Sequence, residues 1–238
     1  MKFGIFSNNV LKIIACVTML IDHIGAILFP TVYALRFIGR ISLPIFIFLL
    51  AEGCYYTKNK IRHLLVIGSF AVVMQVVLYL ATKIIFFSIF IHFTIAIILC
   101  YIIDIIDIFI RCKKTLLSIA MILGFITISV LLFLIDRNTM YFYENYGIYA
   151  IFTPVAVYII RKYVKHIHLF LSIIVICISM VLMELFTPYY LQIYGMLGCI
   201  FILLYNGKKG KLNLKYLFYI FYPLHMAILY GISMLIGG

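Results

Sequence analysis

The sequence predicts an all-α integral membrane protein, a polytopic bundle of about nine transmembrane helices. Composition is the first reason, because 67% of the 238 residues are hydrophobic, 11% are charged and the mean hydropathy is +1.24. A lipid bilayer solvates that much apolar surface, whereas a soluble domain of this size could not bury it. The second reason is spacing, since basic or turn-rich breaks separate apolar runs that are long enough to cross a bilayer.

Each apolar run is expected to form a helix, because a helix satisfies its own backbone hydrogen bonds in lipid. The runs are too long, and alternate too little, for the strands of a membrane barrel. The expected spans are residues 11–29, 40–57, 62–81, 84–103, 115–135, 147–160, 167–186, 190–206 and 214–236. The sixth and eighth are shorter than the roughly 20 residues that a span needs.

The chain shows no linker, repeat or low-complexity segment, so residues 1–238 are expected to form a single domain. Its first apolar run contains Lys12 and the pair Asp22-His23, and no small-residue cleavage site precedes them. This run is therefore expected to remain as the first helix instead of being removed as a signal peptide.

Positive charges alternate from one connection to the next. One set of connections holds most of the 19 lysine and arginine residues: Lys2; Lys58, Lys60 and Arg62; Arg111, Lys113 and Lys114; Arg161, Lys162 and Lys165; and Lys208, Lys209, Lys211 and Lys215. The other set holds Arg36, Arg40, Lys83 and Arg137. The positive-inside rule then predicts that the first set and the N-terminus are cytoplasmic. This placement attributes the net charge of +12 to topology and anionic lipid, and argues against nucleic acid as a partner.

Metal and disulfide sites are not predicted. The six cysteines are scattered through apolar runs without a Cys-x-x-Cys motif, so they are expected to pack as small apolar side chains. His166 and His168 lack the i, i+4 spacing of a helical metal site. The sequence also lacks a glycine-rich nucleotide loop, a Gly-x-Ser-x-Gly elbow and a His-Glu-x-x-His motif.

Lys12 and His23 are candidate functional residues on the first helix, because an ionisable group inside a span is costly. Their separation is close to three helical turns, so they share one face about 16 Å apart along the axis. An imidazole can take up a proton near neutral pH, which suits His23 to act as a general base. Asp22 is adjacent in sequence but faces another side of the helix. Alternatively, Lys12 reaches the lipid headgroups and His23 satisfies a neighbouring backbone group.

Arg36 and Arg40 form a second candidate pair, at the start of the second span. Their i, i+4 spacing places them on one helix face, and Gly39 between them permits another helix to approach closely. Two guanidinium groups suit a phosphate, a carboxylate or an oxyanion. A structural ion pair with an acidic residue such as Glu52 is the alternative.

The last span contains Tyr222, Pro223 and His225, which combine an intramembrane histidine with a proline kink. The alternative is a packed histidine that donates to a carbonyl oxygen. His92 and Glu184 are weaker candidates, since each is isolated in an apolar run and a satisfied buried group explains either one.

Three segments resemble the TraX family of bacterial membrane proteins, which is known from conjugation systems. They are residues 11–25 (LKIIACVTMLIDHIG), residues 36–53 (RFIGRISLPIFIFLLAEG), and residues 205–225, which begin with YNGKKG and end with KYLFYIFYPLH. Their order and spacing extend from one end of the chain to the other. The resemblance implies N-acetylation of an exported pilin subunit at its N-terminus, and a location in the bacterial cytoplasmic (inner) membrane.

A second resemblance concerns the donor. Lys12 and His23 are similar to the basic-x10-His signature of membrane acyltransferases that modify extracytoplasmic sugars. In those enzymes the histidine is the proposed catalytic residue and acetyl-coenzyme A (acetyl-CoA) is the donor, which implies that His23 is catalytic and that Lys12 is its partner on the same face. Arg36, Arg40 and His225 match TraX-type motif positions.

Together these residues predict a membrane-embedded acetyltransferase-like domain. Acetyl-CoA is expected to enter from the cytoplasm, and the acceptor is an exported peptide, a pilin-like protein or an envelope glycan that offers an amine or a hydroxyl group. Catalytic roles are expected for Asp22, His23, Arg40 and His225, and donor-binding roles for Lys12, Arg36 and Tyr222. No metal is expected.

Two other functions stay open. A small proton-linked transporter would use His23, Glu52, Glu184 and His225 as a proton relay, although the sequence shows no inverted repeat. A non-catalytic membrane assembly protein predicts instead that substitutions of His23 and Arg40 have no effect as long as the protein folds.

Overall fold

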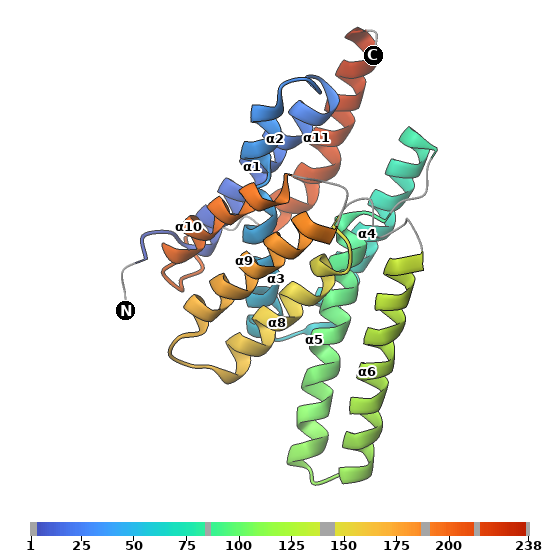
Figure 1. Cartoon of the computed structure of the whole chain (residues 1–238), viewed down its shortest axis with the longest axis vertical. Coiled ribbons are helices and arrows are strands. Elements are labelled where there is room, and N and C mark those ends of the chain that lie inside the picture. The colour runs from blue at the N-terminus through green and yellow to red at the C-terminus, as the bar shows by residue number, and fades with distance from the viewer. Residues whose placement is uncertain (1–3, 84–86, 139–145, 187–190, 212–214, 237–238) are drawn as a thin grey trace. The chain divides into compact units, whose positions relative to one another are not determined.

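In the computed structural model the described residues lie mostly in helices (Figure 1). The structure describes residues 4–83, 87–138, 146–186, 191–211 and 215–236. Its helices are α1 (Asn8–Ile27), α2 (Tyr33–Gly39), α3 (Ser42–Tyr56), α4 (Lys60–Thr82), α5 (Ile89–Arg111), α6 (Thr115–Asn138), α8 (Tyr149–Tyr163), α9 (His168–Phe186), the 3-10 helix η1 (Gln192–Leu197), α10 (Gly198–Leu203) and α11 (Lys215–Ile236). Within the described ranges the only β-type pairing is a bridge between Phe6 and Tyr205. The predicted all-α class is confirmed.

In the described part of the chain, six helices are long and apolar enough to cross a membrane: Asn8–Ile27, Tyr33–Tyr56, Lys60–Leu80, Ile89–Arg111, Thr115–Arg137 and His168–Phe186. Each coincides with a predicted span, so the multi-pass membrane character is confirmed. Two further apolar helices, Gln192–Leu203 and Ile220–Ile236, are shorter. The predicted span 147–160 forms α8, which has 15 residues.

Two predicted boundaries differ from the structure by seven residues or more. The second span is predicted to begin at residue 40, whereas α2 already begins at Tyr33 and Arg40 lies at its junction with α3. The fourth span is predicted to end at residue 103, whereas α5 continues to Arg111. Both extensions are mostly apolar, although each contains charged residues. In the second extension Asp104 and Asp107 do not end the helix, because lysine side chains neutralise them.

Local chemistry defines several helix ends. Ser7 caps α1 by accepting from the N–H of Val10 at 3.4 Å, and Asn59 caps α4 by accepting from the N–H of Arg62 at 2.9 Å. Such caps satisfy N–H groups that have no partner inside the helix. The α4 helix ends where Lys83 adopts the left-handed conformation, with a φ of 57°.

The chain divides into two compact units. Unit 1 comprises Met1–Leu49, Ile167–Leu185 and Tyr190–Gly238, and unit 2 comprises Leu50–His166 and Phe186–Tyr189. The division falls inside α3, so that the first half of this helix belongs to unit 1 and the second half to unit 2. This division into units does not test the predicted single domain of residues 1–238, which stays a prediction.

Unit 1 contains α1, α2, α9, η1, α10, α11 and the first half of α3. The α1 and α2 helices approach closely at Gly39, because a Cβ atom at that position would overlap Asp22. Backbone hydrogen bonds of 2.9 Å join Phe6 to Leu204 and Asn206, so the start of the chain pairs with the segment that follows α10. The fully buried apolar side chains of unit 1 include Leu11, Ile45, Ile47, Phe48, Ile176, Met180, Met183 and Ile202.

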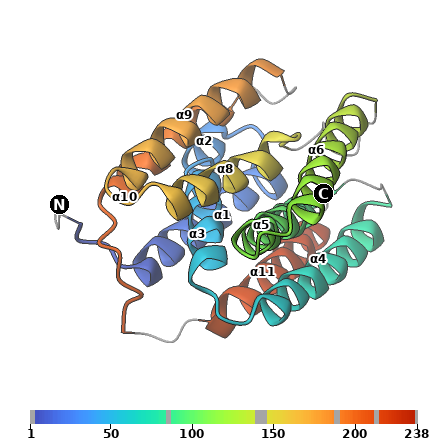
Figure 2. The ribbon, with the colours of Figure 1, turned by 90° about the horizontal axis from the view of Figure 1, so that it is seen from below.

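Unit 2 contains α4, α5, α6, α8 and the second half of α3. The α5 helix is central to this unit because it packs against α4, α6 and α8, and Figure 2 shows it beside α4 and α6. In the most apolar stretch of α5, 50% of the residues are buried, whereas 6% are buried in the corresponding stretch of α6. The fully buried apolar side chains of unit 2 include Met74, Ile97, Leu99 and Ile151.

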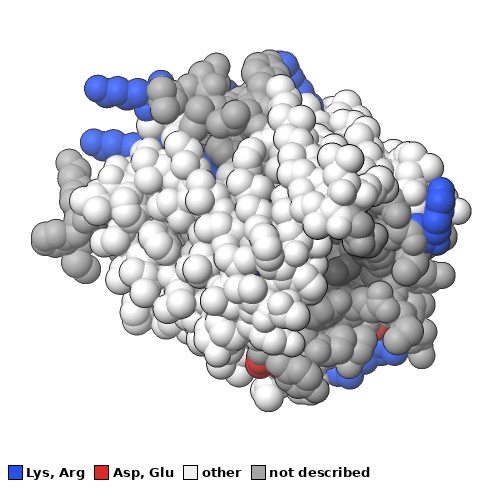
Figure 3. Space-filling model, turned by 90° about the horizontal axis from the view of Figure 1, so that it is seen from above, with Lys and Arg blue, Asp and Glu red and all other residues white. Residues whose placement is uncertain are grey.

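Large apolar side chains are exposed on most helices. Leu65, Leu116, Phe170 and Leu224, from four different helices, are 54–82% exposed. Figure 3 shows a face on which uncharged side chains dominate. In water such a surface would drive association, whereas lipid tails solvate it, so this surface agrees with residence in a membrane.

Candidate functional site

His23 and His225 meet at the contact between α1 and α11 in unit 1. The Nδ1 atom of His23 lies 2.8 Å from Nε2 of His225, and the rings are stacked with centroids 5.0 Å apart. The Nδ1 atom of His225 lies 2.8 Å from the carbonyl oxygen of Phe221, one turn earlier in α11. We call His23 and His225 the histidine pair.

These contacts determine which nitrogen atoms carry protons. A carbonyl oxygen can only accept, so Nδ1 of His225 is the donor to Phe221. In neutral His225 the Nε2 atom therefore has a lone pair and accepts from Nδ1–H of His23. The remaining ring nitrogen of His23, Nε2, then carries a lone pair. His225 thus holds His23 in the tautomer that can act as a base.

Aromatic rings surround the histidine pair. Tyr222, which is buried, meets both rings edge-on, at centroid distances of 5.8 Å to His23 and 5.1 Å to His225. Phe221 stacks on His225 with its centroid at 4.9 Å. Pro223 lies within α11 between these residues, where it removes one backbone donor. The rings restrict how the two imidazoles can turn.

Asp22 and Arg36 form an ion pair between α1 and α2. Nη1 of Arg36 donates to Oδ2 of Asp22 at 2.8 Å and to the Asp22 backbone carbonyl at 3.0 Å. The same carboxylate turns its other oxygen toward Arg40, whose Nη2 lies 3.8 Å from Oδ1. We call Asp22, Arg36 and Arg40 the arginine cluster.

Arg40 is the less well-paired member of the arginine cluster. It is only 5% exposed, yet its Nε has no hydrogen-bond partner among the described residues, and neither has Oδ1 of Asp22. Buried polar atoms are nearly always paired in folded proteins. The guanidinium group of Arg40 therefore has donor capacity in reserve.

The histidine pair and the arginine cluster adjoin, because Asp22 and His23 are consecutive in α1. Both arginines also act electrostatically on His23. Two guanidinium groups share one carboxylate, so the cluster carries net positive charge beside a neutral base. Such an arrangement can take a proton from a nucleophile and stabilise a negative charge that develops nearby.

The structure brings six of the seven predicted site residues together, namely Asp22, His23, Arg36, Arg40, Tyr222 and His225. Lys12 is the exception, because it lies toward the other end of α1, where its electrostatic partners are Lys209 and Cys16. The helical repeat does place Lys12 and His23 on one face, but about 16 Å of helix separates them.

The weaker candidates have structural partners. Glu52 accepts from Nε of Arg161 at 2.6 Å, whereas the structural alternative paired it with Arg36 or Arg40. Glu184 accepts from the N–H of Ile193 at 3.2 Å, and Nδ1 of His92 lies 3.0 Å from the carbonyl oxygen of Ser88. Each of these three residues therefore has at least one partner in the structure.

Unit 2 contains an ion-pair network that the sequence analysis does not anticipate. Asp104 accepts from Nζ of Lys60 and of Lys162, each at 2.6 Å, and from the hydroxyl of Tyr158 at 2.5 Å. Lys162 also contacts Asp107. The i, i+3 spacing of the two aspartates on α5 is the signal that would have revealed a shared acidic face.

Electrostatics and packing both stabilise this network. Partial burial alone would lower the pKa of Lys162, but its hydrogen bonds to Asp104 and Asp107 outweigh burial and raise the pKa above its ordinary value. Arg161, next in the chain, lies over the rings of Tyr55 and Tyr56, at 4.4 Å and 5.3 Å from their centroids. The network joins the ends of α4, α5 and α8.

No group of three or more His, Cys, Asp or Glu side chains in the described ranges is arranged to hold a metal ion. The six cysteines are free thiols, five of them buried or half-buried. The prediction that no metal takes part stays a prediction.

One protein family and one fimbrial protein resemble the chain along almost its whole length. The sequence model of the TraX protein family matches residues 7–233. A probable fimbrial assembly protein of Dichelobacter nodosus, FimC of serogroup H1, is 28% identical over 254 residues, which cover 96% of this chain and 96% of that protein. An uncharacterized protein of Rickettsia prowazekii is 36% identical over 69 residues, or 29% of this chain and 26% of that protein. No solved structure matches the chain.

The family match includes every member of the histidine pair and of the arginine cluster, and it covers far more than half of the chain. It also includes all six helices that are long and apolar enough to cross a membrane. This multi-pass membrane protein therefore belongs to the TraX family.

Proposed function

We propose that this protein is a membrane-embedded acetyltransferase that moves an acetyl group from cytoplasmic acetyl-CoA to an exported or envelope acceptor. The acceptor is a pilin-like or other exported peptide with an amine, or an envelope glycan with a hydroxyl group. The bacterial cytoplasmic membrane is the proposed location, because a multi-pass protein there meets acetyl-CoA on one side and exported material on the other. Membership of the TraX family and the fimbrial assembly relative support a pilus-related acceptor.

The histidine pair is the observation that carries this proposal. His225 leaves Nε2 of His23 with a lone pair, so His23 removes the proton of the acceptor amine or hydroxyl while that group attacks the thioester carbonyl. The carbon–sulfur bond then breaks, and the proton passes from His23 to the departing CoA thiolate. The products are the acetylated acceptor and CoA, and His23 is again neutral.

The arginine cluster supports the same step. As the tetrahedral intermediate forms, negative charge develops on the former carbonyl oxygen. Arg40 has unused donor capacity beside His23, and Arg36 adds a second positive charge. Donors that are already oriented in a dry site stabilise such an oxyanion strongly. Asp22 orients Arg36 by two hydrogen bonds, and the ring of Tyr222 limits the space available to the donor.

Lys12 fits a role in donor binding at the other end of α1. Lys12 and Lys209 act on each other as like charges, and Lys208 and Lys211 nearby in sequence are exposed. Like charges that lie together favour an anion between them. In the predicted topology this end faces the cytoplasm, so the phosphate groups of acetyl-CoA suit it.

A measurement of acetyl transfer by the purified protein in lipid nanodiscs tests the proposal. Acetyl-CoA is supplied with exported peptides or envelope polymers, and mass spectrometry detects the gain of one acetyl group. His23→Ala is expected to lower the transfer rate by a factor of about 10² to 10⁴, which is the usual contribution of a general base. His166→Ala is the matched control, because His166 is exposed and lies outside the site. Equal rates for both variants would show the proposal to be wrong.

A non-catalytic role in assembly is the second candidate, favoured by the fimbrial assembly protein of Dichelobacter nodosus. This role predicts that cells with His23→Ala still assemble their surface appendages normally and that no acceptor gains an acetyl group in the presence of the wild-type protein. The same variant therefore separates the two functions.

A further inference from the structure

An apolar groove lies between α6 and α8 in unit 2. It has a volume of about 360 Å³ and opens at the protein surface, and the described side chains in its wall are Phe125, Ile126, Ser129, Val130, Phe133 and Phe152. The hydroxyl of Ser129 donates to the carbonyl oxygen of Phe125 at 2.8 Å, so its hydrogen-bonding capacity is used inside α6. The groove therefore offers a hydrocarbon surface without a polar group that would have to lose water.

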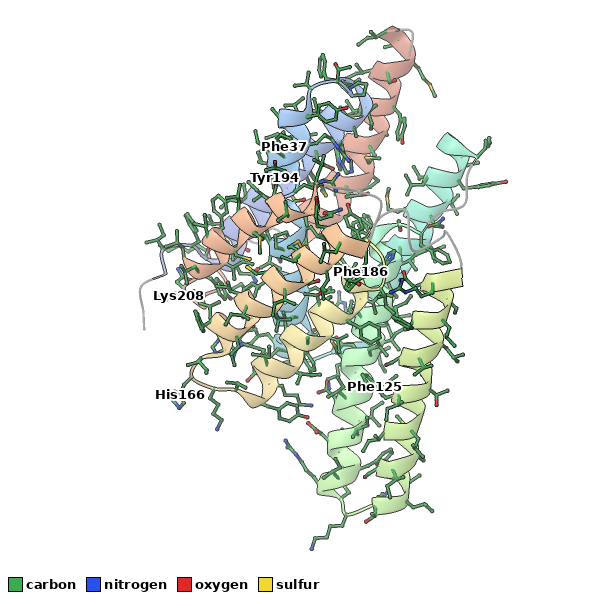
Figure 4. All side chains as sticks on the ribbon, viewed as in Figure 1. Phe37, Phe125, His166, Phe186, Tyr194 and Lys208 are labelled. Carbon is green, nitrogen blue, oxygen red and sulfur yellow. The ribbon has the colours of Figure 1, made fainter. Side chains whose placement is uncertain are left out.

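Arg137 lies next to this groove, at the end of α6. Its guanidinium carbon, Cζ, is 5.4 Å from the ring centroid of Phe133, which is one turn earlier and belongs to the groove wall, and 5.8 Å from that of Phe186. Figure 4 shows Phe125 in the middle of α6 and Phe186 at the height of its upper end. The groove thus leads from the middle of the helix to a cation at its end.

The charge of Arg137 is available to a ligand. Arg137 is exposed, and no ion pair joins it to a carboxylate in the described ranges. Its neighbour Asp136 acts on it electrostatically, but Asp136 is buried and hydrogen bonds to the backbone of Ile148, at the start of α8. Asp136 therefore stabilises the helix junction, while the guanidinium group of Arg137 keeps its donors for an anion at the membrane surface.

The length of the groove matches one leaflet of a bilayer. Phe125 and Arg137 are twelve residues apart in α6, which is about 18 Å along the helix axis. Half of the hydrocarbon core of a bilayer is about 15 Å thick. An acyl chain whose headgroup lies at Arg137 would therefore end near Phe125, in the middle of the membrane.

The volume of the groove excludes a neighbouring helix. A helix about 10 Å across occupies roughly 1,200 Å³ over the thickness of one leaflet, about three times the volume of the groove. An acyl chain is thin enough to enter. Lipid is also the solvent that α6 requires, because it packs on α5 and only 6% of its most apolar stretch is buried.

We infer that this groove binds an anionic phospholipid, with one acyl chain between α6 and α8 and the phosphate group on Arg137. A guanidinium group can donate two parallel hydrogen bonds to phosphate oxygens, and the rings of Phe133 and Phe186 hold it in place. A zwitterionic lipid binds more weakly, because its own cation competes for the phosphate. Binding at this site does not depend on the proposed acetyl transfer.

Two lipids with the same acyl chains test the headgroup contact. Native mass spectrometry of the purified protein measures the retention of phosphatidylglycerol, which is anionic, and of phosphatidylcholine, which is zwitterionic. The wild-type protein is expected to bind phosphatidylglycerol about tenfold more tightly, and Arg137→Gln is expected to remove this preference. Lys83→Gln is the matched control, because Lys83 is also an exposed cation at the end of a long helix and lies over Tyr79, one turn earlier, at 5.9 Å. It should keep the preference.

A second pair of variants tests the acyl chain. Ser129→Leu fills the groove and is expected to weaken the binding of both lipids about tenfold. Thr127→Leu is its matched control, because the hydroxyl of Thr127 likewise donates to a carbonyl oxygen one turn earlier, at 2.9 Å, but Thr127 is exposed and lies outside the groove wall. It should bind both lipids as the wild-type protein does. Both variants should melt near the wild-type temperature in lipid-free detergent.

Three results would overturn the inference. The first is equal retention of the two lipids by the wild-type protein, or a preference that survives Arg137→Gln. The second is wild-type lipid binding by Ser129→Leu, which would mean that the chain does not lie in the groove. The third is a wild-type dimer that Ser129→Leu dissociates, because a second copy of the chain would then occupy the groove in place of lipid.

Discussion

Glu52 in unit 2 and Arg40 in unit 1 are both charged side chains buried among apolar helices, but they are paired differently. In unit 2 the carboxylate of Glu52 is 3% exposed and accepts from Arg161 at 2.6 Å. In unit 1 the side chain of Arg40 is 5% exposed and comes no nearer than 3.8 Å to Asp22, its acidic neighbour, which already holds Arg36. The first pair is complete, whereas the second leaves donors and acceptors unused.

Under the proposed function, this difference separates structural charges from charges that bind a ligand. A completed buried pair has no capacity left, and removing either partner strands the other in an apolar environment. An incomplete pair costs stability in the free protein, but a ligand can recover that cost by supplying the missing partner. Substitutions in unit 2 should therefore act mainly on folding, and substitutions in unit 1 mainly on transfer.

Arg161→Met is expected to have the largest effect on stability. It leaves the carboxylate of Glu52 buried without its partner, which costs about 3–5 kcal/mol of unfolding free energy. The transfer rate per folded molecule is expected to stay at the wild-type value. Thermal unfolding in detergent and transfer measured on the folded fraction check the two parts. A stable variant that is inactive would place Arg161 in the site and break the comparison.

Arg40→Met is expected to show the opposite behaviour. Asp22 keeps Arg36, so no charge is stranded and the melting temperature should change little. The loss of an oxyanion donor is expected to lower kcat by a factor of about 10² to 10³, which is about 3–4 kcal/mol of transition-state stabilisation. Steady-state kinetics beside a melting curve give both numbers. Unfolding without a separate loss of kcat would mean that Arg40 is structural.

His225→Phe is expected to have an intermediate effect. It keeps an aromatic ring against Phe221 and Tyr222 but removes the acceptor that fixes the tautomer of His23. The rate should fall about 10- to 100-fold, since His23 remains but is no longer oriented. His225→Gln, which can still accept a hydrogen bond, should recover part of the rate. Equal rates for the two variants would argue against an orienting role.

The pH dependence of the network around Lys162 should give the smallest effect. The pKa of Lys162 is raised on folding, so its stabilising contribution is fully present below the unfolded value of 10.5 and is lost as the pH rises through the folded value. The melting temperature is therefore expected to fall at strongly alkaline pH. Lys162→Met should flatten this fall, although only slightly, because solvent screens a partly exposed ion pair.

Hydropathy and charge placement were enough to predict the all-α class and the six long apolar helices, because lipid imposes a length and a composition on every span. The cost of charge in lipid also identified Asp22, His23, Arg36, Arg40 and His225. Periodicity within one helix could not show that α1 meets α2 and α11, since it describes a face and not the partner of that face. For this reason the hydrogen bond between His23 and His225 appears only in the folded chain.

Two other features escaped prediction for different reasons. The change from η1 to α10 lies in a segment that looks like one more apolar run, so neither charge nor periodicity marks it. Asp104 was assigned to a connection because charge usually ends a span. Its lysine partners come from α4 and α8, and their positions depend on how three helices pack.

The separation of the histidine pair in the sequence also has a consequence for biosynthesis. His23 lies in α1 and His225 lies in α11, 202 residues later, so α1 is synthesised long before its partner exists. Under the proposed function, a nascent chain that still lacks α11 has no acceptor to fix the tautomer of His23. Full activity then begins only once α11 has been made and has packed against α1.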